Sequence, residues 1–199
     1  MKITSLATAL LAILLLAACA NTSTRPLAGL YDLGPLPAQA ALPALPPLSV
    51  ADVSAPAALD GPRMIYRLAY ANNQQPHPYA DSRWSMAPAE MLGQRLKARL
   101  AAAGGVVATA ADGAAGLPLL RVELNEFSQT FEAPNASTAQ VSARATLFSG
   151  RSLLAQKSFL RQLPAPSADA AGAARALADA SDLLITDLMQ WLTTVPLKK

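Results

Sequence analysis

The residue types that could perform acid–base or nucleophilic chemistry gather in one short segment of the chain. His77 lies between two prolines, Asp81 follows it, and Ser82 and Ser85 come next. A histidine oriented by a carboxylate can take the proton of a serine hydroxyl, so these are the residue types of a hydrolase. That chemistry needs the base held rigidly within hydrogen-bond reach of the nucleophile. Because residues 71–79 are polar and broken by proline, we predict a loop there, interpret His77 as a solvated loop histidine and expect no enzymatic activity.

Other groups of chemistry-bearing residues give little support to catalysis or metal binding. Glu123, Glu126 and Glu132 follow one another along a predicted strand. Because side chains alternate between the faces of a strand, Glu123 and Glu126 point to opposite sides unless a bulge intervenes, and we interpret the three as a solvated sheet face rather than glycosidase carboxylates. One cysteine and one histidine exclude an internal disulfide framework and a Cys- or His-rich metal site. No glycine-rich phosphate loop follows a strand, so we predict neither a metal nor a cofactor.

Composition and charge narrow the classes of partner. Hydrophobic residues make up 52% of the 199 residues and charged residues 15%, which excludes a disordered polyelectrolyte. With 16 Lys and Arg against 13 Asp and Glu, the formal charge is +3, and this near balance gives no support to nucleic-acid binding. Arg95, Lys97 and Arg99 could meet anionic lipid headgroups, but we interpret them as a solvated helix face. The four phenylalanines are expected in the core rather than on a lipid-accessible surface: Phe127, Phe131, Phe148 and Phe159.

The N-terminal segment has the parts of a bacterial secretion signal. Lys2 gives a positive start, and the apolar run from Ile3 to Ala18 is too short to span a bilayer comfortably. The run ends in Leu16-Ala17-Ala18-Cys19, which resembles the lipobox of bacterial lipoproteins. That resemblance implies removal of residues 1–18, diacylglycerol on the Cys19 sulfur and an acyl chain such as palmitate on the new amino group. Cys19 is therefore the predicted lipid-attachment site, and this covalent lipid stands in place of any cofactor.

The lipid anchor sets the expected compartment. One acyl chain holds a protein only marginally at a membrane, whereas two or three hold it stably. Ala20 rather than aspartate follows Cys19, which by the retention rule of enteric-type lipoproteins favours the periplasmic face of the outer membrane. The segment that follows is rich in Ala and Pro and predicts a semi-extended tether, with one short strand at Leu30–Leu33. The predicted organisation is a signal peptide at 1–18, an anchored tether at 19–47 and one domain at 48–195.

Hydrophobic periodicity predicts the elements of that domain. Strands are predicted at about 48–53, 64–68, 120–131, 141–147 and 153–160, and helices at 88–103 and 168–192. The last three strands are joined by short turns and form an antiparallel meander, and a parity shift at Phe127 predicts a bulge or strong twist in the first of them. The predicted fold class is α+β: a single antiparallel or mixed β-sheet packed against two α-helices and preceded by a Pro/Ala-rich tether.

Several short motifs follow one another in a recognisable order. They are Tyr31-Asp32-Leu33-Gly34, Leu59-Asp60-Gly61-Pro62-Arg63-Met64-Ile65-Tyr66-Arg67, Arg83-Trp84 before Pro88, and Val122-Glu123-Leu124-Asn125-Glu126-Phe127. With the alanine-rich C-terminal helix, they resemble the ABC-type transport auxiliary lipoprotein family (PqiC-like) over about residues 30–192. Ser85 departs from the alanine that usually follows the tryptophan.

The resemblance implies a non-catalytic accessory of a mammalian-cell-entry (MCE) type ABC transport system, which moves lipids or other hydrophobic compounds between inner and outer membranes. It implies an MCE-domain periplasmic protein as partner, the membrane as a second partner through the acyl anchor, and lipid as a cargo that this subunit could contact. We expect Tyr66, Arg67, Arg83 and Trp84 to contact the partner or define the core, with Trp84 mainly buried. The sequence does not decide whether the protein forms a homo-oligomer. It also leaves two alternative functions: a structural envelope lipoprotein without cargo, and a lipid-anchored hydrolase that uses His77.

Overall fold

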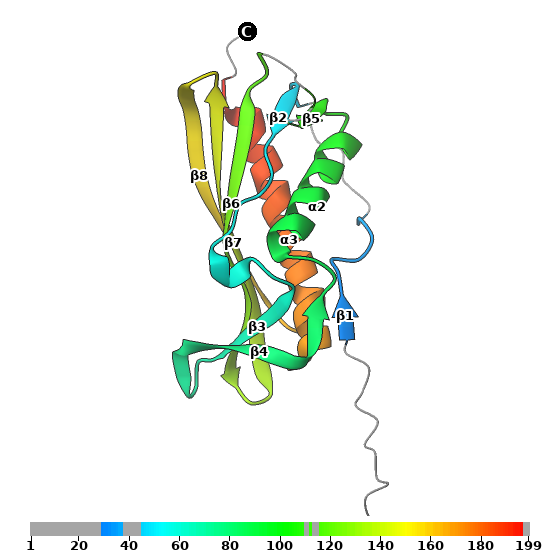
Figure 1. Cartoon of the computed structure of the whole chain (residues 1–199), viewed down its shortest axis with the longest axis vertical. Coiled ribbons are helices and arrows are strands. Elements are labelled where there is room, and N and C mark those ends of the chain that lie inside the picture. The colour runs from blue at the N-terminus through cyan, green and yellow to red at the C-terminus, as the bar shows by residue number, and fades with distance from the viewer. Residues whose placement is uncertain (1–28, 38–44, 110–111, 113–115, 197–199) are drawn as a thin grey trace, which may run out of the picture.

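The structure, a computed structural model, describes residues 29–37, 45–109, 112 and 116–196 (Figure 1). The strands are β1 Gly29–Tyr31, β2 Leu48–Val50, β3 Arg63–Leu68, β4 Asn72–Trp84, β5 Val107–Thr109, β6 Leu119–Ala133, β7 Ala136–Ser149 and β8 Ser152–Pro164. The helices are the short 3₁₀ helix η2 Ala57–Leu59 and the α-helices α2 Pro88–Ala102 and α3 Ala170–Thr194. Within the described residues, eight strands form one mixed sheet that packs with the two α-helices, which confirms the predicted α+β class.

Strand β6 is the axis of the sheet because it pairs along both of its edges. On one edge, β6, β7 and β8 form the predicted antiparallel meander. On the other edge, β2 runs parallel to the start of β6, and β3 runs parallel to its end. Strand β5 extends the sheet from β2, whereas β4 pairs antiparallel with β3, and β1 pairs parallel with β4. Strands β1, β4 and β3 lie together at the end of the molecule where the described chain begins, opposite the C-terminal end (Figure 1).

The predicted irregularity in β6 is a bulge. The register between β6 and β7 shifts between Leu124 and Glu126, so Asn125 has no partner in the ladder. An extra residue reverses the alternation of side chains. Leu124 and Phe127 therefore both lie on the buried face, although their spacing of three would place them on opposite faces of a regular strand.

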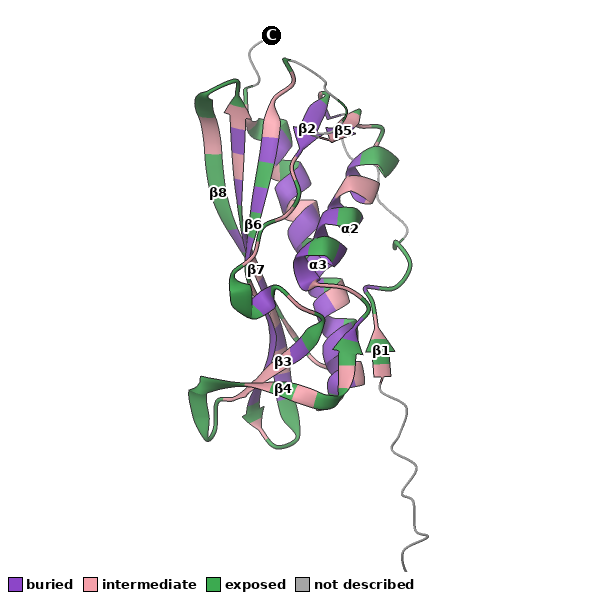
Figure 2. Cartoon of the chain, viewed as in Figure 1, coloured by how far each residue is buried: buried purple, intermediate pink, exposed green. Residues whose placement is uncertain are grey.

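Helix α3 covers the meander with an apolar stripe. It packs against β6, β7 and β8, and α2 packs against α3 and β5. Leu177, Leu184, Leu188 and Leu192 follow one another at spacings of seven, four and four, and each is at most 2% exposed. Figure 2 shows that much of α3 is buried along its length. Burying one such leucine stabilises the fold by about 1.5–3 kcal/mol. The helix begins after Asp169, whose carboxylate accepts a hydrogen bond from the Gly172 main-chain N–H at 2.7 Å.

The prediction of a loop at residues 71–79 was wrong for all but Ala71, because residues 72–79 belong to strand β4. Strands β3 and β4 form a hairpin in which Pro76 pairs with Arg67 and Pro78 pairs with Ile65. In an antiparallel pair, every second residue directs its N–H away from the partner strand. Pro76 and Pro78 are two residues apart, so both can occupy such positions, where a missing N–H does not break the pairing with β3. Strand β1 pairs with β4 only at Ser82–Trp84, so the part of β4 that holds the prolines is an edge of the sheet and can contain both without losing its ladder.

Part of the predicted tether also belongs to the folded body. Residues Gly29–Tyr31 form β1 and pair with Ser82–Trp84 of β4. Leu33 and Leu45 are 7% and 5% exposed and belong to the hydrophobic core. The remaining residues of the predicted tether, 19–28 and 38–44, lie outside the described part of the chain.

Candidate functional site

The four residues expected to contact a partner or define the core lie on strands β3 and β4, where they divide between two faces. Tyr66 and Arg67 are neighbours in β3, and Arg83 and Trp84 are neighbours in β4. Because successive side chains of a strand point to opposite faces, each pair contributes one residue to the inside and one to the outside. Trp84 is 1% exposed, whereas Arg83 is exposed and Arg67 lines a concave site on the outside.

The inner face is held by aromatic packing. The Tyr66 ring lies 4.8 Å from that of Tyr79 and 5.6 Å from that of Phe131, measured between centroids. The Trp84 ring lies 5.4 Å from that of Phe127 in an edge-to-face arrangement. These are favourable aromatic geometries, worth about 0.5–1.5 kcal/mol per pair beyond the area that they bury. Tyr66 and Trp84 thus fasten the β3–β4 hairpin to β6.

A buried polar chain lies beside this aromatic cluster. The Tyr79 hydroxyl donates to Gln129 Oε1 at 2.6 Å, and Gln129 Nε2 donates to Ser137 Oγ at 2.7 Å. Gln129 is fully buried, so both the oxygen and the nitrogen of its side-chain amide need these partners. Burial, and secondarily the negative charge of Asp169, raise the pKa of Tyr79 above its usual value. The phenol therefore stays protonated and continues to donate.

The outer face gathers arginines. Arg63 of β3 lies directly opposite Arg83 of β4, an arrangement of like charges that destabilises a sheet. Arg83 is also paired in register with Leu30 of β1, which is 61% exposed. Arg67 donates from Nη1 to the Asn73 carbonyl at 3.1 Å. Within the described residues, none of these three arginines forms an ion pair.

A concave site of about 280 Å³ lies on this outer face, between η2 and the β3–β4 hairpin. Arg63, Arg67 and Glu126 contribute the charged groups of its lining, and Leu59 and Ile65 contribute apolar groups. The bulge in β6 lies beside it, because Asn125 and Glu126 are lining residues and also mark the register shift.

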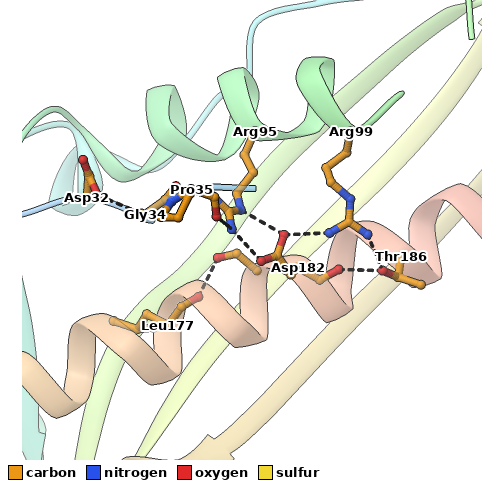
Figure 3. A network of polar contacts seen from close by, with 9 residues as sticks. Asp32, Gly34, Pro35, Arg95, Arg99, Leu177, Asp182 and Thr186 are labelled. Carbon is orange, nitrogen blue, oxygen red and sulfur yellow. Dashed lines mark hydrogen bonds and ion pairs between the residues drawn. The ribbon is translucent and has the colours of Figure 1, made fainter. Parts of the chain in front are cut away.

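A buried ionic network joins the two α-helices to the N-terminal segment, as Figure 3 shows. Asp182 of α3 accepts from Arg95 Nε at 2.9 Å, from Arg95 Nη2 at 2.6 Å and from Arg99 Nη1 at 2.8 Å. The side chains of both arginines are 6% exposed, and that of Asp182 is 14% exposed. Arg95 also donates to the main-chain carbonyls of Gly34 and Pro35, at 3.0 and 3.2 Å. The network therefore fastens the chain that follows β1 to α2 and α3.

The interpretation of a solvated helix face was wrong for Arg95 and Arg99. They are one turn apart and flank the leucine stripe of α2, so the packing of α3 across that flank buries them. Lys97 differs from them, because it is partly exposed and pairs with the exposed Asp52 at 2.9 Å. Asp182 was placed off the apolar stripe of α3 and given no role. Nothing local distinguishes it from Asp187, which also flanks the stripe, and its partners are more than 80 residues away in sequence.

The candidate catalytic residues do not come together among the described residues. His77 stacks on Tyr66 with ring centroids 5.3 Å apart, and no hydrogen bond joins it to Asp81, Ser82 or Ser85 in the described structure. The described residues also contain no cluster of three or more His, Cys, Asp or Glu that could hold a metal ion.

The other residues singled out in the sequence have ordinary surroundings. Glu123 pairs with Arg144 of β7 at 3.1 Å on the exposed face of the sheet. Phe127, Phe131 and Phe159 are buried, as expected. The prediction was wrong for Phe148, which is only partly buried beneath the Arg121 guanidinium, because it lies on the face of β7 opposite the buried Leu147. Among the helices that the structure describes, none is long and apolar enough to cross a membrane. Cys19 lies outside the described residues, so lipid attachment there stays a prediction.

The chain thus folds as an α+β domain with an arginine-rich outer face, and a buried ionic network joins its helices α2 and α3. The sequence matches the ABC-type transport auxiliary lipoprotein component family over residues 31–188, and the chain belongs to that family. This confirms the resemblance seen in the sequence motifs. A search of curated proteins found no match.

Solved structures support the fold. Protein XCC0632 from Xanthomonas campestris superposes with a TM-score of 0.70 at 22% identity, over 83% of this chain and 95% of that chain. The crystal structure of an uncharacterized protein superposes with a TM-score of 0.65 at 16% identity, over 82% of this chain and 97% of that chain. At such identities, the similarity shows a shared fold alone.

Proposed function

We propose that this protein is a lipid-anchored periplasmic accessory of an ABC transport system of the MCE type, moving lipids or other hydrophobic compounds between the two membranes. The match to the transport auxiliary family over residues 31–188 carries the proposal. The accessory works by binding and positioning, and the partner ATPase supplies the energy. Its partner is the MCE-domain protein that bridges the periplasm.

The N-terminal pattern supports the location. Cys19 ends a lipobox-like sequence, and Ala20 follows it in place of a retention aspartate. The protein would therefore be held at the periplasmic face of the outer membrane by acyl chains on Cys19. The short connection between Cys19 and β1 keeps the folded body near that surface.

The geometry suits a docking subunit. The Arg95–Asp182–Arg99 network joins the two α-helices and the chain that follows β1 into one unit. A positioning role needs such rigidity, because a partner surface is bound most tightly when it is already formed.

The test is complementation in the source bacterium after deletion of the gene. We expect deletion to raise sensitivity to detergents and lipophilic compounds, and the unaltered gene to restore resistance. Cys19→Ser should fail to restore it, since the protein would lose its anchor and leave the membrane fraction. His77→Ala should restore it fully, because positioning needs no general base. Loss of function in His77→Ala, with normal protein levels, would instead favour a hydrolase.

A further inference from the structure

We infer that the concave site between η2 and the β3–β4 hairpin binds the phosphoethanolamine headgroup of a membrane phospholipid, with its phosphate at Arg63 and Arg67 and its ammonium at Glu126. The inference rests on the proposed attachment of the protein to a membrane. It goes further by assigning a ligand site and the chemistry of its occupant.

The first support is the pairing of the cations. Arg95, Arg99, Arg144 and Arg161 each form an ion pair with a carboxylate. The guanidinium of Arg63, like that of Arg83, makes no hydrogen bond or ion pair within the described residues, and that of Arg67 makes one hydrogen bond, from Nη1 to a carbonyl. A guanidinium has five N–H donors in a planar fork, and a phosphate oxygen pair is a partner that this fork fits. The two arginines thus keep donors available for a phosphate.

The second support is Glu126, which distinguishes a zwitterion from a simple anion. Its partly buried carboxylate lines the same concave site as the two arginines and has no hydrogen bond or ion pair within the described residues. A carboxylate repels a free anion, so a site built for inorganic phosphate alone would be weakened by it. An ammonium group joined to the phosphate by two carbons satisfies both signs of charge.

The third support is the apolar part of the lining. Leu59, Ile65, Pro76 and Pro78 surround the charged groups, and prolines offer no N–H to a polar ligand. Ligand sites commonly combine a mostly apolar wall with a few placed polar groups. Here the apolar wall would contact the glycerol and the first carbons of the acyl chains.

The fourth support is the position of the site relative to the anchor. Cys19 precedes Gly29 by ten residues, and ten residues span at most about 35 Å in any conformation. Gly29 begins β1, which pairs with β4 at Ser82–Trp84, so the described chain begins beside the strand pair that builds the site. The membrane that holds the anchor is therefore within reach of the site. The exposed Leu30 of β1 and Arg83 of β4 lie side by side between the start of the described chain and the site.

The test is a protein-observed NMR titration of the purified full-length protein in maltoside detergent. The probes are glycerophosphoethanolamine, glycerophosphoglycerol, inorganic phosphate and a triglutamate peptide. We expect glycerophosphoethanolamine to shift the amides of β3 and of Glu126, and to bind about tenfold more tightly than the other two phosphate probes. The triglutamate peptide should produce no comparable shift. The experiment needs no transporter, so its outcome is independent of whether the proposed partner is found.

Three variants make the assignment specific. Arg67→Gln should weaken every phosphate probe about tenfold, whereas Glu126→Gln should remove only the preference for glycerophosphoethanolamine. Arg151→Gln, an exposed arginine in the turn between β7 and β8, is the matched control and should change neither. Amide spectra that keep the native pattern away from the site show that each variant is folded.

Three results would overturn the inference. No shift in β3 with any phosphate probe would remove the site. Equal binding of inorganic phosphate would make it an anion site rather than a headgroup site. Tighter binding of triglutamate than of the phosphate probes would assign the arginine face to an acidic protein segment.

Discussion

Replacing Asp182 by asparagine should destabilise the protein far more than the loss of one surface charge would. The carboxylate of Asp182 accepts three hydrogen bonds from two guanidinium groups whose side chains are 6% exposed. Asparagine has the same shape but no charge, so the two buried cations of Arg95 and Arg99 would lose their counter-ion. Removing one partner of a buried ion pair costs about 3–5 kcal/mol. For a chain of this size, that corresponds to a fall in Tm of about 10 °C.

Urea and thermal unfolding of the purified protein, followed by circular dichroism, would measure the loss. Asp52→Asn is the matched control, because Asp52 also pairs with a cation, Lys97, but its side chain is 97% exposed. The control should cost less than about 1 kcal/mol. A triple variant that replaces Arg95, Arg99 and Asp182 by apolar residues should recover much of the lost stability, since no buried charge is then left unpaired. An Asp182→Asn variant whose unfolding free energy matches that of Asp52→Asn would refute the structural role given to the network.

Three further changes test the helix cap and the buried polar chain. Asp169→Ala should cost about 1 kcal/mol, because the α3 N-terminus loses its cap. Hydrogen bonds from the Gly172 N–H and from the Ser167 hydroxyl hold the pKa of Asp169 below its usual value. The cap therefore stabilises the fold above the usual pKa of an aspartate, and this stability is lost as the pH falls through the folded-state pKa. Urea unfolding at several pH values should show wild type and variant converging in acid. In a helix, alanine is usually about 1 kcal/mol more stable than glycine. Gly172→Ala should nevertheless lower Tm, because the added Cβ would collide with the Ser167 carbonyl. An unchanged Tm would contradict that collision. Tyr79→Phe should lower the free energy of unfolding in urea by about 1–3 kcal/mol, since it leaves the side-chain oxygen of Gln129 buried without its donor. A smaller loss would mean that Gln129 finds another partner.

Periodicity in the sequence was sufficient to predict the meander and both α-helices. The change of parity at Phe127 predicted a bulge or a strong twist in β6, and the structure shows a bulge there. Residues 72–79 were missed because proline and polar side chains are typical of loops. They are acceptable in a strand because this part of β4 pairs only with β3 and forms an edge of the sheet. The short strand β1 was predicted, but its parallel partner was not, since nothing local indicates a pairing across more than fifty residues.

The candidate site was only partly predictable for a similar reason. Arg67 and Arg83 were singled out in the sequence, and strand alternation explains why they face outward while Tyr66 and Trp84 face inward. Glu126 was considered only as one of several carboxylates on a sheet face, because its place in the same concave site as Arg63 depends on the β3–β6 pairing. The pairing of Arg95 and Arg99 with Asp182 likewise depends on how α2 and α3 cross, which helix periodicity does not specify.

The most direct measurement of the central claim is to purify the full-length, acylated protein from membranes in mild detergent and to identify its partners by mass spectrometry. A transport accessory should recover an MCE-domain protein in stoichiometric amount, together with components of its ABC permease and ATPase. Cys19→Ser, which cannot receive the lipid, is the matched control and should lose the membrane-associated complex. A clean, acylated preparation with no transporter component would contradict the account, and would leave the protein as a structural lipoprotein of the envelope that shares only the fold of its family.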